Sequence, residues 1–87
     1  DYSADIDKVV EILLAVAAAD NRILKEPAPF AALSEHGESA LIFTMRVWCA
    51  SDNYWNVYYY LCAEVKKALD AAGIDIPFNQ LNVRLSR

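Results

Sequence analysis

The chain of 87 residues contains only two glycines, three prolines, two cysteines and one histidine. Two separate glycines, Gly37 and Gly73, cannot build the glycine-rich loop that binds phosphate groups. A single histidine leaves no convincing Ser–His–Asp or Cys–His arrangement for nucleophilic catalysis, and too few soft ligands for a metal site. We therefore expect no catalytic residues, no metal site and no cofactor.

The two cysteines are too few for a disulfide framework. Two readings stay open for Cys49 and Cys62: a pair of reduced, buried thiols, or a single disulfide between them. The lone His36 stands between Glu35 and Glu38, so we interpret it as a solvated turn residue and not as a pH sensor.

Basic residues are also scarce, with 8 Lys and Arg against 12 Asp and Glu, a net charge of −4 and a pI near 4.7. Binding to nucleic acid needs clustered positive charge, so no nucleic-acid partner is expected. The longest apolar run, residues 12–19, is far short of the roughly 20 residues that span a bilayer. The acidic N-terminus does not resemble a signal peptide, and a start at Asp1 and not Met suggests a fragment or a processed product.

Hydrophobic residues nevertheless make up 56% of the chain, which is high for one small domain. A domain of this size buries a modest share of its surface, so part of this apolar excess should lie on surfaces that contact a partner.

Hydrophobic periodicity predicts five elements in the order α-β-β-α-β. A 3.6-residue period predicts a helix over residues 5–19, with Ser3 or Asp5 as N-cap and with an end at residues 20–21. After the extended Pro27–Pro29 segment, a short strand is expected over 30–34 and a polar turn over 35–38.

Strict alternation over residues 39–50 predicts the clearest strand, which should pair with residues 30–34 as a hairpin. Its inward face is uniformly apolar and its other face is mixed. The inward set is Leu41, Phe43, Met45, Val47 and Cys49; the other is Ile42, Thr44, Arg46 and Trp48.

The next helix is predicted over residues 54–72, with residues 51–53 as N-cap candidates and Gly73 as the C′ residue, followed by an apolar contact from Ile74. Its apolar stripe is Val57, Leu61, Val65, Leu69 and Ala72, with Tyr58, Cys62 and Ala68 beside it. A last strand is predicted over 80–85.

This order indicates an α+β fold: a ferredoxin-like split βαβ sandwich in which two helices pack on one face of an antiparallel sheet. Three strands are present where that fold has four. We therefore expect that the first strand is missing from the fragment and lies ahead of Tyr2, and that the exposed sheet edge pairs with another chain.

Five collinear segments resemble the small-conductance mechanosensitive channel (MscS) family. They are residues 46–48 (Arg-Val-Trp), 71–80 (Ala-Ala-Gly-Ile-Asp-Ile-Pro-Phe-Asn-Gln), 20–27 (Asp-Asn-Arg-Ile-Leu-Lys-Glu-Pro), 2–8, and the hairpin segment 33–39. The chain departs from the family pattern at Ser3, His36 and Asn79, where the family usually has Asp, Leu and Pro.

The resemblance implies that residues 1–87 form the C-terminal α/β domain of the channel's cytoplasmic vestibule and are not an enzyme. It further implies a homo-heptamer in a bacterial inner membrane that opens under tension and releases solutes on hypo-osmotic shock. The partners would be copies of the chain itself and the middle β-domain of the same chain, and the only membrane contact would be through upstream helices.

Four residues are predicted to lie at a subunit or domain interface: Arg46 and Trp48 on the mixed strand face, and Trp55 and Tyr59 one turn apart on the second helix. Tyr and Trp are enriched at such interfaces. The alternative is a free-standing ferredoxin-like module that binds a ligand or has a regulatory role, because this fold carries many functions.

Overall fold

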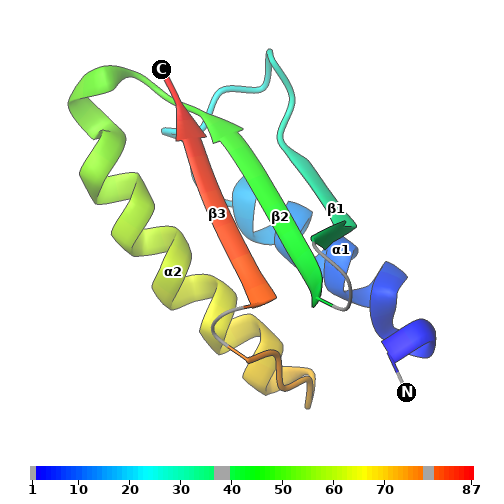
Figure 1. Ribbon diagram of the computed structural model, residues 1–87. Helices are drawn as coiled ribbons and strands as arrows, with labels where there is room; N and C mark the ends of the chain where they lie inside the picture. The colour runs from blue at the N-terminus through cyan, green and yellow to red at the C-terminus, as the bar shows by residue number, and fades with distance from the viewer. Residues whose placement is uncertain (1, 37–39, 78–79) are drawn as a thin grey trace.

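The elements follow the predicted order. The computed structural model describes residues 2–36, 40–77 and 80–87. In chain order the elements are α1 (Tyr2–Ala18), β1 (Phe30–His36), β2 (Ala40–Trp48), a 3₁₀ turn η1 (Ser51–Asn53), α2 (Tyr54–Ala71) and β3 (Leu81–Ser86) (Figure 1). The α+β class and the order α-β-β-α-β are therefore confirmed.

The three strands form one mixed sheet in the order β1-β2-β3. β1 and β2 pair antiparallel, with Phe30 opposite Arg46 and Leu33 opposite Phe43, so the predicted hairpin is confirmed. The predicted turn falls partly outside the described residues, and β1 extends through His36.

The expectation of a wholly antiparallel sheet was wrong, because β3 pairs with β2 in parallel, Met45 opposite Val83. The reason is the crossover: α2 carries the chain back along the sheet, so β3 starts at the same end as β2. The ferredoxin-like order keeps these two strands parallel and places its first strand between them. In this structure β2 and β3 bond directly to each other.

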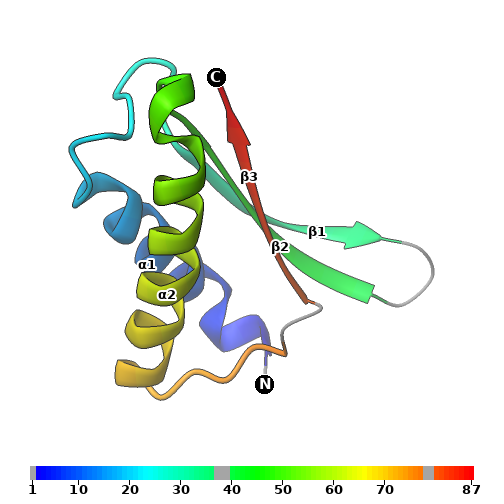
Figure 2. The same cartoon turned by 90° about the vertical axis from the view of Figure 1, so that its left-hand side faces the viewer.

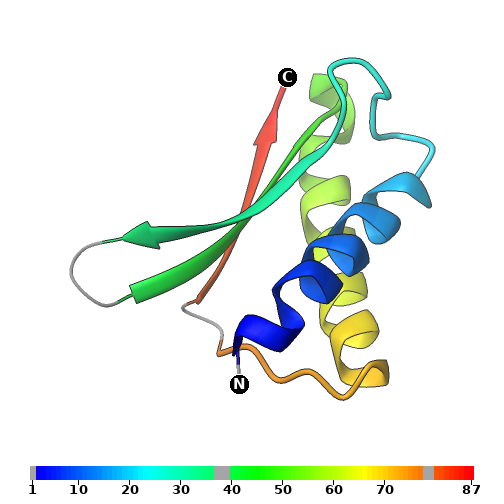
Figure 3. The same ribbon diagram turned by 90° about the vertical axis from the view of Figure 1, so that its right-hand side faces the viewer.

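Both helices lie on one face of the sheet, and the opposite face has no helix over it (Figures 2 and 3). The core between the layers consists of alternate residues along β2 and just after it, every third or fourth residue of the helices, and Ile23 from the loop after α1. It comprises Val9, Leu13, Ala17, Ile23, Phe43, Met45, Val47, Cys49, Val57, Leu61, Val65 and Leu69. The predicted inward face of β2 is thus confirmed for four of its residues, while Leu41 is half-buried.

The helix termini differ in part from the prediction. α1 begins at Tyr2, so Ser3 and Asp5 lie inside the helix and not at its N-cap. Residues 51–53 form the turn η1, and Asn53 takes the N-cap position of α2 without a capping hydrogen bond from its side chain. The helix ends at Ala71, and Ala72 is exposed, because the chain leaves the helical path there.

Gly73 terminates α2 as predicted. Its φ of +73° lies in the left-handed region that only glycine adopts without strain. The N–H of Gly73 donates to the Asp70 carbonyl at 3.0 Å and that of Ile74 to the Leu69 carbonyl at 2.9 Å. These two bonds form a Schellman motif, and Ile74 then packs against the core as expected.

The two cysteines are in different environments. Both are free thiols, so the disulfide alternative is not what the structure contains. Cys49 is buried as predicted, but Cys62 is exposed, because it lies one position beyond Leu61 on α2 and turns away from the sheet.

An ion pair within the loop after α1 holds an arginine that contacts α2. The Asp20 side chain is buried and accepts from Arg22 three times: from the backbone N–H (2.9 Å), from Nε (3.0 Å) and from Nη2 (2.7 Å). The Arg22 guanidinium also lies 5.4 Å from the centre of the Tyr60 ring on α2. These hydrogen bonds from Arg22 lower the pKa of Asp20.

Replacing Leu61 with alanine should destabilise the fold strongly, because Leu61 has no exposed area. A buried Leu→Ala change costs about 2–5 kcal/mol. Leu24→Ala is the matched control: this side chain is 44% exposed, so the change should stay within about 0.5 kcal/mol. Urea unfolding measures both, and equal losses would contradict the assigned core.

Asp20→Asn should lower the free energy of unfolding by on the order of 1 kcal/mol at neutral pH, because the charge that Arg22 pairs with is removed. The pKa of Asp20 is lower in the folded state than its unfolded-state value of 3.8. The stabilisation from the ionised Asp20 is therefore present above pH 3.8 and is lost as the pH falls through the folded-state pKa. The difference from wild type should therefore disappear in acid. Asp70→Asn, which breaks the exposed pair with Lys66, should change nothing measurable at either pH. A difference that persists in strong acid would be the contrary result.

Candidate interaction surface

The face of the sheet that the helices leave uncovered carries the mixed side chains of β2. Residues that pair across a sheet point to the same face. Phe30 pairs with Arg46, and Arg46 pairs with Arg84, so these three side chains form one row across β1, β2 and β3. The next row along β2 joins Ala32, Thr44 and Asn82.

Two cations lie side by side on this open face. Arg46 and Arg84 are opposite each other in the register, on strands that lie about 4.8 Å apart. In the described part of the chain, neither joins any of the three ion pairs. Like charges opposite each other in a sheet are unfavourable, so this pair is suited to an external anionic group.

Trp48 lies at the end of β2 on the same face as Arg46, as predicted. It is half-buried and pairs with Ser86 of β3. Its carbonyl oxygen accepts from the N–H of Leu24 at 2.8 Å, which ties the loop after α1 to this end of the sheet. We call Phe30, Arg46, Trp48 and Arg84 the open-face patch.

The other predicted pair lies on α2. Trp55 and Tyr59 are 59% and 65% exposed, and their rings stack with centroids 6.1 Å apart at 30°. Tyr54 and Tyr58 meet Trp55 edge-on, at 5.0 and 6.1 Å. The four predicted residues therefore form two patches on different layers and not one.

Sequence reasoning missed three members of these surfaces. Phe30 and Arg84 join Arg46 only through the strand register, which alternation within a single strand cannot reveal. The Arg87 guanidinium lies 4.5 Å from the centre of the Tyr54 ring, a cation–π contact between the residue after β3 and α2. The available signal for Arg84 was the alternation of residues 80–85, in which Arg84 lies on the side opposite Leu81, Val83 and Leu85.

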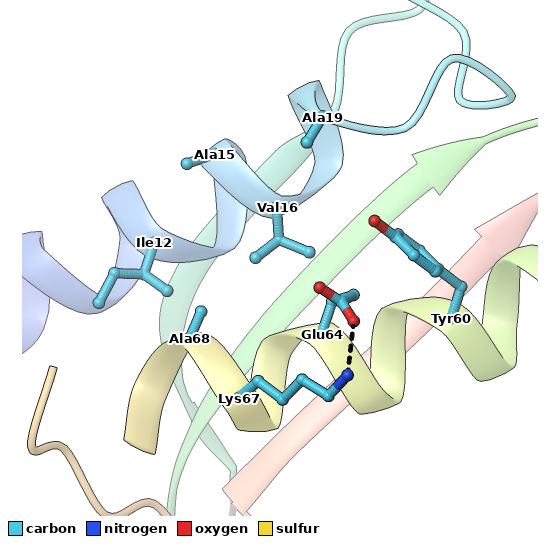
Figure 4. Close-up of a pocket in the computed structure, with 8 residues that line it drawn as sticks. All are labelled: Ile12, Ala15, Val16, Ala19, Tyr60, Glu64, Lys67 and Ala68. Carbon is cyan, nitrogen blue, oxygen red and sulfur yellow. Dashed lines mark hydrogen bonds and ion pairs between the residues drawn. The ribbon is translucent and has the colours of Figure 1, made fainter. Parts of the chain in front are cut away.

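Two hollows border α2. One, of about 410 Å³, lies between α1 and α2, where Ile12, Ala15, Val16 and Ala19 face Tyr60, Glu64, Lys67 and Ala68 (Figure 4). A larger groove of about 900 Å³ runs between α2 and β3; Tyr58, Leu69, Ile76, Leu81 and Val83 are among the residues that line it.

Several ionisable side chains near these hollows are held in ion pairs or keep their protons. The Lys67 Nζ lies 3.2 Å from Glu64 Oε2, and Lys66 bonds to Asp70 at 2.9 Å, an interaction that raises the pKa of Lys66. The nearby Cys62 thiol raises the pKa of Tyr58, and burial raises that of Cys49, so both hold their protons at neutral pH. Among the described residues, no three His, Cys, Asp or Glu side chains are grouped so as to hold a metal ion.

Both helices are too short or too polar for a bilayer: in the part of the chain that the structure describes, no helix could span a membrane.

A protein-family comparison decides the family. The family described as "Mechanosensitive ion channel MscS, C-terminal" matches residues 1–76. The chain belongs to the MscS family. The resemblance seen in the five sequence segments is therefore confirmed, and the family is one of channels and not of enzymes.

Individual MscS-family relatives align along almost the whole chain. The small-conductance mechanosensitive channel of Edwardsiella ictaluri is 45% identical over 84 residues, 97% of this chain and 29% of the relative. An uncharacterised MscS family protein of Buchnera aphidicola (subspecies Baizongia pistaciae) is 40% identical over 86 residues, 99% of this chain and 31% of the relative. The chain thus spans less than a third of these relatives. No solved structure gives a significant match.

Proposed function

We propose that the chain is the cytoplasmic vestibule domain of a tension-gated channel that releases solutes on hypo-osmotic shock. The observation that carries this proposal is the match of residues 1–76 to the C-terminal domain of the MscS family. In this proposal residues 1–87 are one domain of a longer polypeptide, which is a homo-heptamer in a bacterial inner membrane. The segment lies on the cytoplasmic side and contacts the middle β-domain of its own chain.

The surfaces of the domain support a structural role and not a catalytic one. Its exposed aromatic side chains, Trp55 and Tyr59, and the open-face patch have the composition of protein–protein contacts. We assign Arg46, Trp48, Trp55 and Tyr59 to contacts with neighbouring subunits or with the middle domain. Assembly would bury part of the apolar excess that the composition reveals.

A strand ahead of Tyr2 is part of the proposal. The ferredoxin-like order places such a strand between β2 and β3, where it would move β3 outward beneath α2 and leave Arg46 and Arg84 on one face of the sheet, separated by that strand. The groove between α2 and β3 is the space into which β3 would move. Its presence is consistent with a helical layer wide enough to cover four strands.

The alternative is a free-standing module that binds a ligand. The feature that favours it is the same groove, because a concave, largely apolar hollow is where a small molecule would bind.

The full-length polypeptide should restore survival of osmotic downshock in bacteria that lack mechanosensitive channels, and should carry current in membrane patches only under tension. Deleting the segment equivalent to residues 1–87 should reduce the amount of assembled channel. Absence of tension-activated current, combined with thermal stabilisation of the domain by a small molecule, would favour the free-standing module.

Trp48→Ala or Trp55→Ala should weaken the assembled protein, because aromatic anchors carry much of the energy of an interface. We expect dissociation to rise on the order of tenfold for each, which corresponds to about 1.4 kcal/mol. Native mass spectrometry across a detergent or urea series measures it. Leu24→Ala, an exposed apolar side chain outside both patches, is the control. If all three variants dissociate alike, the assignment of the two tryptophans to an interface is wrong.

A further inference from the structure

Among the described residues, exposed carboxylates outside the ion pairs include Glu26 and Asp52 and, as two on one helix, Asp7 and Glu11 of α1. In this helix Val9, Leu13 and Ala17 are buried against the sheet. A residue two positions along an α-helix is rotated by about 200° around the helix axis. The side of α1 opposite this buried stripe therefore faces outward. That stripe consists of exposed residues: Asp7, Glu11, Leu14 and Ala18. We call it the α1 stripe.

The charges on the α1 stripe have no partner within the described residues. Neither Asp7 nor Glu11 joins any of the ion pairs there, just as neither Arg46 nor Arg84 does. Lys8, the nearest cation in the sequence, is exposed and lies three residues before Glu11, about 60° around the helix, but the two form none of the ion pairs among the described residues. One subunit therefore presents two unpaired carboxylates on one surface and two unpaired guanidinium groups on another.

These two surfaces lie on opposite sides of the molecule. α1 belongs to the helical layer, and its stripe points away from the sheet, whereas the open-face patch is on the far side of the sheet (Figures 2 and 3). A contact between two different surfaces on opposite sides of identical subunits is head-to-tail, and it produces a ring when the rotation between subunits closes.

The two surfaces also match in their apolar parts. The open-face patch combines Arg46 and Arg84 with Phe30, which is 52% exposed, and Trp48. The α1 stripe combines its carboxylates with Leu14, which is 36% exposed, and Ala18. Guanidinium groups pair with carboxylates through two parallel hydrogen bonds, and the aromatic rings can cover the aliphatic end of the stripe.

We propose that the occupant of the open-face patch is the α1 stripe of a second copy of this chain, with Arg46 and Arg84 of one copy facing Asp7 and Glu11 of the next. The proposal rests on the proposed function, since it names the surfaces through which subunits of that assembly meet. It commits to self-association through α1 and not to an unrelated acidic protein.

Site-directed cross-linking in the full-length polypeptide tests the contact. Exposed Cys62 is first replaced by serine, and buried Cys49 is kept. Glu11→Cys and Arg84→Cys are then introduced into the same subunit. Because each subunit holds one cysteine on each contact surface, oxidation should produce a denaturing-gel ladder at multiples of the subunit mass. Each single variant should produce almost none.

A control pair of cysteines and a reversal of the two charges make the test more specific. Glu11→Cys with Lys66→Cys, which places the second cysteine at an exposed position on α2, should give no ladder. Without cysteines, Arg84→Glu should reduce the assembled fraction, and adding Glu11→Arg should restore it. Both positions are exposed, and circular dichroism checks that the variants remain folded.

The outcomes separate the two proposals. Native mass spectrometry that finds only monomers overturns both the proposed assembly and this contact. An intact oligomer that gives no ladder, or gives equal ladders with the two cysteine pairs, overturns the contact alone. A ladder confined to the Glu11–Arg84 pair, together with restoration by the charge exchange, establishes the contact.

Discussion

The burial of one face of the sheet beneath two helices is the interaction on which the rest of this structure depends. Phe43, Met45 and Val47 are almost completely buried between β2 and the helices. Because side chains alternate along a strand, burying these three forces Arg46 and Trp48 to the other face. A one-residue shift would place the Arg46 guanidinium in an apolar core, at a cost of several kcal/mol. The packing that stabilises the fold therefore also determines which side chains are offered to a partner.

The end of α2 determines the remaining part of the sheet. Gly73 turns the chain out of the helix, and Ile74 holds that turn against the core through its side chain. The chain then returns to the end of the sheet where β2 begins, so β3 can pair only in parallel with it. That pairing brings Arg84 beside Arg46. The turn at Gly73 thus contributes to placing two positive charges side by side on the open face of the sheet.

Most of the fold could be predicted from the sequence, because local patterns report burial directly. The alternation of residues 41–49 and the stripe from Val57 to Leu69 identified the core, and Gly73 was recognised from its position alone. Strand direction and register are relations between distant segments, so the parallel β3 and the Arg46–Arg84 row were not visible. The exposure of Cys62 depends on a rotation of α2 that periodicity defines only to within one position.

The net charge of the chain and the charges on its individual surfaces have opposite effects on self-association. The net charge of −4 opposes the approach of a second copy, which has the same charge. Such repulsion acts over about 8 Å at physiological ionic strength, whereas guanidinium–carboxylate pairs act at contact. A contact between the open-face patch and the α1 stripe would therefore be weak between free domains in solution. Subunits already held beside one another by other parts of a polypeptide meet at a high effective concentration, and under that condition the same short-range pairs can select the register between neighbours.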